Sequence, residues 1–273
     1  MTVRHRLPPP HWSIWQRSCR TNESVIARHR LPPPPSVDWA YFLDVDGTLI
    51  DIAATPAAAH VDRHLLALVE RLHRACDGAL ALVSGRALAD LELRLGGLPV
   101  PVAGQHGLER RDAGGALHVH EAAPDAMRAI RDRLESVCAS HPGLLLEDKG
   151  LSLALHYRLA PSLAGYVHRL LRDMVAEAGA GLRLQEGKCV LEVKPAGCDK
   201  GTAIEAYLAE APYRGRRPVF IGDDITDEHG FAVVNALAGI SIKVGTGRSC
   251  ARYHLADVNA VRQWLAAALE ERT

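Results

Sequence analysis

The chain has 273 residues, and its 32 lysine and arginine residues are balanced by 32 aspartate and glutamate residues. A neutral chain lacks the basic surface by which proteins bind nucleic acid or anionic membranes, and no apolar run approaches the roughly 20 residues of a membrane span. The apolar fraction of 48% is enough to form the core of one large domain or of two smaller ones.

The six cysteines are scattered along the chain and form no Cys-x-x-Cys pair. This pattern favours free thiols in a reducing cytoplasm over a disulfide framework or a zinc site. The N-terminus contains arginines but no apolar segment, so it does not resemble a secretory signal. We expect a cytoplasmic protein, and a monomer, whose partners include neither nucleic acid nor membrane.

The first 35 residues differ in composition from the rest of the chain. The sequence Arg-His-Arg-Leu-Pro-Pro-Pro occurs twice, at residues 4–10 and 28–34. Consecutive prolines cannot donate backbone hydrogen bonds and favour the polyproline II conformation. Such a segment could dock onto a proline-binding partner, but its composition favours a disordered leader, which we expect over residues 1–35.

The segment 41–49 is the most informative part of the chain. Its apolar residues 41–43 predict a short buried strand, which is followed by Asp44, Asp46 and Gly47. Carboxylates are costly to bury without a partner, so two of them at the end of a buried strand indicate a cation or a reaction. Mg²⁺ binds such oxygen ligands together with a substrate phosphate. One carboxylate could also attack phosphorus while its neighbour moves a proton.

The elements that follow alternate between helix and strand. Apolar patterns predict helices over residues 61–75 and 257–271. They predict buried strands over residues 79–83, 218–221 and 240–244. This order is typical of a doubly wound α/β sheet, in which ligands bind at the carboxyl ends of the strands. Three of the strands are followed by Asp44, Ser84 and Asp223. We therefore expect these side chains at one edge of the sheet.

Residues 108–194 have a different pattern. They begin near a predicted hairpin turn, and apolar and polar residues then alternate over 151–158 and 188–194. Alternation of this kind is typical of an antiparallel sheet with one solvated face. We therefore expect a second domain over residues 108–194, inserted into a core formed by residues 36–107 and 195–273.

Only five of the 32 basic residues are lysines, and four of these five lie between residues 149 and 200. A lysine supplies a compact positive charge that arginine does not replace freely. This placement favours a function for Lys149, Lys188 and Lys200. Lys194 fits the solvated face of an alternating strand.

Four short motifs occur in order: Asp-Val-Asp-Gly-Thr at 44–48, Ser-Gly-Arg at 84–86, Asp-Lys-Gly at 199–201 and Gly-Asp-Asp at 222–224. Together they resemble the motifs of haloacid-dehalogenase-type (HAD) phosphatases. More narrowly, the chain resembles the trehalose-6-phosphate phosphatase family at residues 104–107, 147–158, 188–195 and 222–228. The resemblance implies a doubly wound, Rossmann-like parallel-sheet core with an inserted α+β cap domain of the C2 type.

The resemblance also implies the chemistry of the core. Asp44 would be the nucleophile that attacks phosphorus. Asp46 would protonate the departing sugar oxygen and later deprotonate the water that hydrolyses the aspartyl-phosphate. The cofactor would be Mg²⁺, held by Asp44, the backbone carbonyl of Asp46 and Asp223.

Further core residues would hold the phosphoryl group and organise its surroundings. Ser84, Thr48 and Lys200 would bind the phosphoryl oxygens, and Lys200 would also act in catalysis by offsetting the negative charge. Asp224 and Asp227 would orient waters or Lys200.

The resemblance assigns recognition of the second glucose largely to the cap. A disaccharide phosphate is uncharged over most of its surface, so its hydroxyls need paired donors and acceptors, and a closing cap would also exclude water. The residues expected to contact the substrate are Glu147, Lys149, Arg158, Lys188, Glu192, Gln105 and His106.

The expected function is that of a Mg²⁺-dependent phosphatase, which releases trehalose and phosphate from trehalose 6-phosphate in the last step of trehalose biosynthesis. Two alternatives stay open. One is the same chemistry on another sugar phosphate such as sucrose 6-phosphate. The other is a non-catalytic sugar-phosphate sensor, against which the presence of both Asp44 and Asp46 argues.

Overall fold

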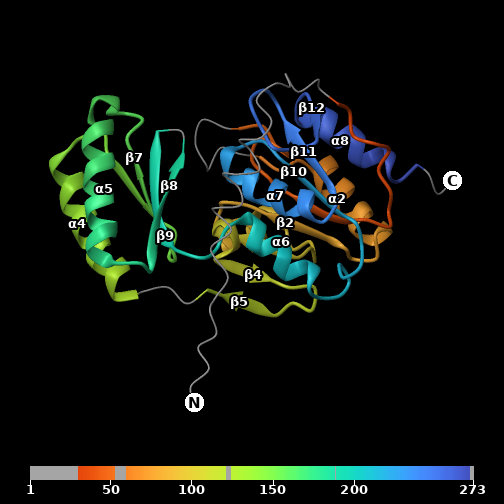
Figure 1. The fold of residues 1–273 in the computed structure, drawn as a ribbon, viewed down its shortest axis with the longest axis horizontal. Helices are drawn as coiled ribbons and strands as arrows, with labels where there is room; N and C mark the ends of the chain where they lie inside the picture. Colours follow the sequence, from red (N-terminus) through yellow and green to blue (C-terminus); the bar gives the residue numbers. More distant parts are fainter. Residues whose placement is uncertain (1–29, 53–59, 121–123, 188, 271–273) are drawn as a thin grey trace, which may run out of the picture.

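The computed structural model describes residues 30–52, 60–120, 124–187 and 189–270. Figure 1 shows two bodies side by side, each made of one sheet with helices packed against it. The larger body contains the early and late parts of the chain, and the smaller body is formed by the middle.

The larger sheet has eight strands in the order β12-β11-β10-β1-β2-β3-β4-β5. The strands from β12 to β3 in this order pair in parallel, and β4 and β5 pair antiparallel. The strands are β1 (Ala40–Leu43), β2 (Leu80–Val83), β3 (Val102–Gly104), β4 (Glu109–Arg111), β5 (Leu117–Val119), β10 (Pro218–Gly222), β11 (Ile240–Val244) and β12 (Tyr253–Leu255). This order confirms the predicted doubly wound α/β core.

Helices cover both faces of the larger sheet. They are α2 (Arg63–Ala75), α3 (Leu88–Arg94), α6 (Lys200–Leu208), α7 (Glu228–Ala236) and α8 (Val258–Ala267). The side chains of the central strand β1 alternate between two buried faces of the sheet, and for this reason its residues are apolar throughout. Tyr41 meets Trp264 of α8 on one face, and Phe42 stacks on Tyr213 and contacts Tyr207 of α6 on the other.

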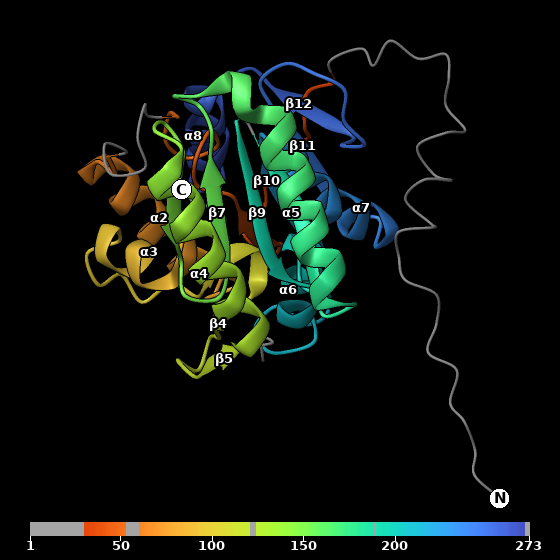
Figure 2. The ribbon, with the colours of Figure 1, turned by 90° about the vertical axis from the view of Figure 1, so that its left-hand side faces the viewer.

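The smaller sheet is antiparallel, with the order β6-β7-β9-β8. Its elements are α4 (Pro124–Ser140), β6 (Leu145–Asp148), β7 (Leu153–His156), α5 (Ala164–Ala178), β8 (Leu182–Gly187) and β9 (Val190–Pro195). Figures 1 and 2 show α4 and α5 on the side of this sheet that faces away from the larger body. Leu155 and Leu191 face these helices and lie in a buried apolar cluster separate from that of the larger body.

One predicted boundary differs from the structure. The residues from 108 onward were expected in the inserted domain, but β4 pairs with β3 and β5 pairs with β4, so both strands extend the larger sheet. The smaller body therefore begins at α4. The hairpin turn itself was correctly recognised at 112–115, because Gly115 N donates to Asp112 O. A turn signal shows that two strands pair but does not show which sheet they join.

The segment before β1 was expected to be disordered up to residue 35, but its described part contacts the larger body. Arg30 O accepts a hydrogen bond from His254 N at 3.0 Å, and Pro33 O accepts one from Trp264 Nε1 at 2.9 Å. Prolines lack a donor but keep their carbonyl acceptor, and a buried indole N–H needs an acceptor. Residues 1–29, which hold the first Arg-His-Arg-Leu-Pro-Pro-Pro copy, lie outside the described residues.

In the described part of the chain, short 3₁₀ helices also connect other elements: η2 (Gln105–Gly107), η3 (Pro161–Leu163) and η4 (Ile225–Asp227). Within the described residues, no helix combines the length and the apolar character that a membrane span requires. The five cysteines in this part of the chain carry free thiols, as predicted. Cys19 lies outside it.

Candidate active site

Three neighbouring strands bring polar side chains to one edge of the larger sheet. β10, β1 and β2 are adjacent and parallel, and they lead directly into Asp223, Asp44 and Ser84. Asp44 and Ser84 are almost fully buried. The carboxyl edge of the sheet therefore holds the groups that the sequence placed there.

An ion-pair network lies at the centre of this edge. Lys200 Nζ donates to Asp44 Oδ1 at 2.6 Å and to Asp227 Oδ1 at 2.7 Å, and all three side chains are buried. Asp227 Oδ2 also accepts from the backbone N–H of Asp224 at 2.9 Å. Asp227 thus contacts Lys200, and Asp224 contacts Asp227 through its backbone N–H. The expected role of Asp227 in orienting Lys200 stays a prediction.

The start of α6 explains how Lys200 reaches this position. The preceding residue Asp199 is the N-cap, and its side chain accepts from Thr202 N at 2.9 Å. The hydroxyl of Thr202 in turn accepts from Asp199 N, which completes a capping box. The first residue of the helix is therefore held firmly at the site.

Burial and crowding of like charges change the acidity of the site. Burial raises the pKa of Asp44 well above its usual range, Lys200 opposes this, and Asp227 and Asp223 reinforce it. Burial, followed by the charge of Asp227, raises the pKa of Asp223 to about 6. Burial alone would lower the pKa of Lys200, but Asp227 and Asp44 outweigh it and raise that pKa. The raised pKa values of Asp44 and Asp223 indicate that the single positive charge of Lys200 does not fully compensate the charges of the aspartates at this site.

The arrangement fits a hard divalent cation. Asp44, Asp223 and Asp227 each offer a carboxylate oxygen, and these atoms lie within 4.8 Å of one another. Asp223 Oδ1 is buried and has no hydrogen-bond partner among the described residues. Oxygen ligands and an unsatisfied buried carboxylate are what Mg²⁺ or a similar ion requires. Asp46 contributes no side chain to this cluster.

Asp46 instead forms an ion pair with Arg86. The guanidinium donates from Nε to Asp46 Oδ2 and from Nη2 to Asp46 Oδ1, both at 2.6 Å. Arg86 also donates to Asp90 Oδ2 at 2.9 Å. Arg86 belongs to the Ser-Gly-Arg motif, but its partner was not predicted, because Asp46 lies 40 positions away in the sequence.

Thr48 and Ser84 lie beside the nucleophile candidate and the Arg86 loop. Thr48 Oγ1 donates to Asp44 Oδ2 at 3.2 Å. Ser84 Oγ accepts from Arg86 N at 3.2 Å. Both side chains are buried, Thr48 against Asp44 and Ser84 against the backbone of Arg86.

Several expected sugar contacts converge where the smaller body meets this edge. Lys149 Nζ lies 3.4 Å from Glu192 Oε2 and 3.5 Å from Gly85 O. His106 Nε2 lies 3.8 Å from the same Glu192 oxygen. Glu192 Oε1 and His106 Nδ1 are buried and have no hydrogen-bond partner among the described residues. These orphaned atoms line the boundary between the two bodies.

Gln105 links the two bodies, and both polar atoms of its side chain already have protein partners. Its Nε2 donates to Glu109 Oε1 at 2.9 Å, and its Oε1 accepts from Ser152 of the smaller body at 3.0 Å. Ser152 was not recognised from the sequence, since a serine in an alternating strand carries no distinctive signal.

Two other expected sugar contacts, Glu147 and Arg158, have different surroundings. Glu147 Oε2 lies 2.8 Å from His156 Nε2. This hydrogen bond lowers the pKa of Glu147; burial opposes the shift, and the charge of Lys149 adds to it. Arg158 is exposed. Lys188 falls outside the described residues, so its expected role stays a prediction.

The sequence model of the trehalose-phosphatase family matches residues 42–259. The chain belongs to this family. It is 46% identical over 231 residues to the trehalose-6-phosphate phosphatase of Escherichia coli (strain K12), covering 84% of this chain and 86% of that protein. It is 44% identical to a probable trehalose-phosphate phosphatase of Sinorhizobium fredii, covering 76% of this chain and 78% of that protein.

Solved structures agree with this assignment. A trehalose-6-phosphate phosphatase related protein is 26% identical, with a TM-score of 0.72, and the match covers 85% of this chain and 98% of that chain. A haloacid dehalogenase-like hydrolase from Bacteroides thetaiotaomicron has a TM-score of 0.61 at 15% identity, covering 85% of this chain and 98% of that one. The second likeness shows the fold alone.

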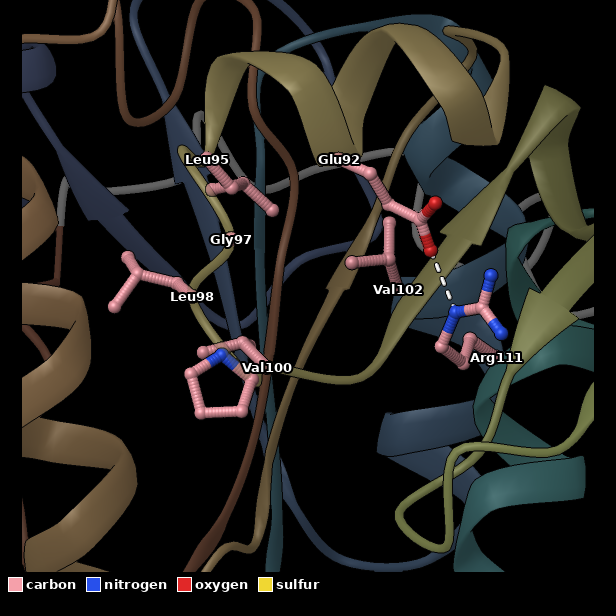
Figure 3. Close-up of a pocket in the computed structure, with 8 residues that line it drawn as sticks. Glu92, Leu95, Gly97, Leu98, Val100, Val102 and Arg111 are labelled. Atoms are coloured by element: carbon pink, nitrogen blue, oxygen red, sulfur yellow. Dashed lines mark hydrogen bonds and ion pairs between the residues drawn. The ribbon is translucent and has the colours of Figure 1, made fainter.

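A separate hollow lies away from the residues that carry the family's motifs. This pocket has a volume of about 370 Å³. It is lined mainly by apolar side chains such as Leu95, Leu98 and Val102, and Glu92 pairs with Arg111 beside them (Figure 3). None of the expected site residues lines it. Its described lining contains a single carboxylate, Glu92, and no serine, cysteine or histidine.

Lys194 was expected on a solvated face and is instead fully buried, with no hydrogen-bond partner for Nζ among the described residues. Burial, followed by the nearby charge of Arg183, lowers its pKa to about 7. The alternation was read correctly, but the face that it predicted as wet is covered by the larger body. Composition alone does not show what packs on a polar face.

Gly47 provides the first test of this site. Its φ is +83°, and a Cβ there would lie 2.2 Å from Asp223 Oδ2. Gly47→Ala should displace the Asp223 carboxylate and weaken Mg²⁺ binding at least about tenfold, as disturbance of ligand orientation typically does. Isothermal titration calorimetry measures this. Gly97→Ala is the matched control, with φ of +82° and no described atom within 4 Å. Equal affinities in the two variants would contradict the assignment of Asp223.

The burial of Lys194 predicts a pH-dependent stability. The unfolded side chain has a pKa near 10.5 and the folded one about 7, so the penalty of burying the charge is complete below pH 7 and fades as pH rises toward 10.5. Lys194→Met should be more stable than wild type at pH 6, on the order of a few kcal/mol at about 1.4 kcal/mol per pKa unit. Urea unfolding should show this difference narrowing by pH 10. A difference that stays constant with pH would refute the lowered pKa.

Proposed function

We propose that this member of the trehalose-phosphatase family hydrolyses trehalose 6-phosphate to trehalose and phosphate, with Mg²⁺ as its cofactor. The observation that carries the proposal is the buried Asp44 carboxylate, held by Lys200 at the carboxyl end of β1 beside two further aspartates. The family match and the 46% identity to the Escherichia coli enzyme support the substrate.

Asp44 is the proposed nucleophile. Lys200 binds its Oδ1 and Thr48 binds its Oδ2, so the carboxylate is fixed in orientation before the substrate arrives. One carboxylate oxygen forms a bond to phosphorus while the bond from phosphorus to the sugar oxygen breaks. In the second step, a water oxygen forms a bond to phosphorus while the bond between phosphorus and the Asp44 oxygen breaks. Phosphate then leaves, and the Asp44 carboxylate is restored.

Asp46 is the proposed acid and base. It gives its proton to the departing sugar oxygen in the first step and takes one from the attacking water in the second, so the residue ends as it began. Both of its oxygens accept from Arg86 in this structure. Proton transfer therefore requires this ion pair to open when the ester enters the site.

Mg²⁺ fits the remaining oxygen atoms. Asp44, Asp223 and the backbone carbonyl of Asp46 are proposed to hold it, and when bound it supplies positive charge that stabilises the phosphoryl oxygens. Lys200 and the Ser84 hydroxyl bind the same oxygens from the protein side. Asp227 keeps Lys200 in place.

We further propose that the larger body is the catalytic core and the smaller body a cap that recognises the sugar. Lys149 and Glu192 point from the smaller body to the edge that holds Ser84 and Gly85. Their unsatisfied or weakly paired atoms suit the hydroxyls of a disaccharide. With β4 and β5 in the larger sheet, the proposed cap starts at α4 rather than at residue 108.

Phosphate release from a panel of esters tests the proposed function. The panel is trehalose 6-phosphate, sucrose 6-phosphate, glucose 6-phosphate and p-nitrophenyl phosphate, each with Mg²⁺ and with a chelator. Trehalose 6-phosphate should react fastest, and activity should vanish with chelator and return with Mg²⁺. Asp44→Asn, which keeps size and shape, should reduce turnover to background. A preference for sucrose 6-phosphate would show that the proposed substrate is wrong. Binding of trehalose 6-phosphate without turnover would support the alternative of a non-catalytic sensor.

The sugar-recognition role of Glu192 gives a second prediction. Glu192→Gln should lower kcat/KM for trehalose 6-phosphate by roughly 10- to 150-fold, the equivalent of one hydrogen bond to a charged group of about 1.5–3 kcal/mol. The loss on p-nitrophenyl phosphate should be much smaller, because that ester lacks a second sugar. Glu186→Gln, at an exposed position of the adjacent strand β8, is the control. Equal losses on both esters would mean that Glu192 only supports the fold.

A further inference from the structure

Gln185 lies at the boundary between the two bodies and was not recognised from the sequence. It pairs directly with Glu192 in the antiparallel register of β8 and β9, so the two side chains share one face of the smaller sheet. Its amide Nε2 lies 2.8 Å from His106 Nε2, which belongs to the larger body. The contact therefore joins a strand of the smaller body to the 3₁₀ helix η2.

The chemistry of this contact fixes the proton on His106. An amide nitrogen donates hydrogen bonds and does not accept them, so His106 Nε2 accepts through its lone pair. The ring is neutral, because burial and then the charges of Lys194 and Lys200 lower the pKa of His106 well below its usual range. A neutral imidazole carries one proton, which must lie on Nδ1.

The protonated Nδ1 is a donor without an acceptor. It is buried and has no hydrogen-bond partner among the described residues. The ring lies against Gly85, where a Cβ would come within 2.6 Å of the ring, and His106 N donates to Ser84 O at 2.9 Å. His106 adopts the left-handed conformation with φ of +58°, which is uncommon for histidine. The backbone thus holds the ring firmly against the Ser84–Gly85 segment.

A neighbouring acceptor is also unsatisfied. Glu192 Oε1 is buried without a described partner, and the other oxygen of that carboxylate, Oε2, lies 3.8 Å from His106 Nε2. An orphaned donor on one residue and an orphaned acceptor on its neighbour suit the hydroxyls of a sugar, which accept and donate at the same time. A phosphate oxygen would satisfy the donor but would be repelled by the carboxylate.

We propose that Gln185 is a positioning residue, which holds His106 as the Nδ1–H tautomer so that this ring donates to the hydroxyls of the sugar phosphate that Glu192 also binds. This inference deepens the proposed function and rests on it for the identity of the sugar. Gln185 itself acts through His106, because its amide is engaged by the ring.

Nitrogen-15 NMR of the histidine rings tests the tautomer directly. The chain has 14 histidines, and the signal that disappears in His106→Gln identifies the ring of interest. In wild type the proton should lie on Nδ1, with Nε2 unprotonated. In Gln185→Glu, whose side chain has the same size but only accepts, Nε2 should become protonated. A wild-type ring with its proton on Nε2, or an unchanged ring in Gln185→Glu, would overturn the proposal.

Kinetics supply the second readout. Gln185→Glu should lower kcat/KM for trehalose 6-phosphate about tenfold, the equivalent of one lost hydrogen bond, and by more than for p-nitrophenyl phosphate. Glu186→Gln, whose exposed side chain lies next to Gln185 in sequence, should behave as wild type. A drop that is equal for both esters would assign Gln185 a purely structural role and refute the positioning one.

The two proposals fail in different ways. If wild type prefers another sugar phosphate, the proposed substrate is wrong, and the kinetic comparison is repeated with the preferred ester. The NMR result does not depend on the substrate. A protonated Nε2 in active wild-type enzyme would refute the role of Gln185 and leave the phosphatase activity standing.

Discussion

The contact of Lys200 with Asp44 and Asp227 is the interaction on which the remainder of the site depends. Three carboxylates within 4.8 Å of one another, two of them buried, would repel strongly without a cation between them. Lys200 occupies that place at 2.6 and 2.7 Å. The capping box that begins α6, the parallel pairing of β1 with β10, and the turn at Gly47 all serve to hold these groups together.

The boundary between the two bodies follows a different physical logic. The strand edge satisfies most of its polar groups internally, whereas the boundary leaves buried atoms of His106, Glu192 and Lys194 without described partners. Such groups are costly in a finished core. A polar ligand would satisfy these atoms, which is consistent with the proposal that the boundary recognises a molecule rich in hydroxyls.

Much of the fold and of the catalytic edge could be predicted from the sequence because the signals are local. An apolar run followed by Asp44, Ser84 or Asp223 defines both a strand and its functional end, and the doubly wound order brings these ends together. Long-range partners could not be predicted. The ion pair of Arg86 with Asp46 and the contact of Gln185 with His106 span 40 and 79 residues. Lys194 was misjudged because alternation identifies a polar face but not what covers it.

The path of the chain from β9 into α6 has a mechanical consequence. Glu192 lies in β9, which ends at Pro195, and Lys200 begins α6 after a short connection. Arg183 of the smaller body donates to the carbonyl of Cys198 in that connection, while Asp199 anchors the other end to the helix. Under the proposed function, this short connection joins the strand that contacts the sugar to the lysine that contacts the phosphate. A tilt of the smaller body on sugar binding would then reach the first turn of α6, and with it Lys200, through the backbone.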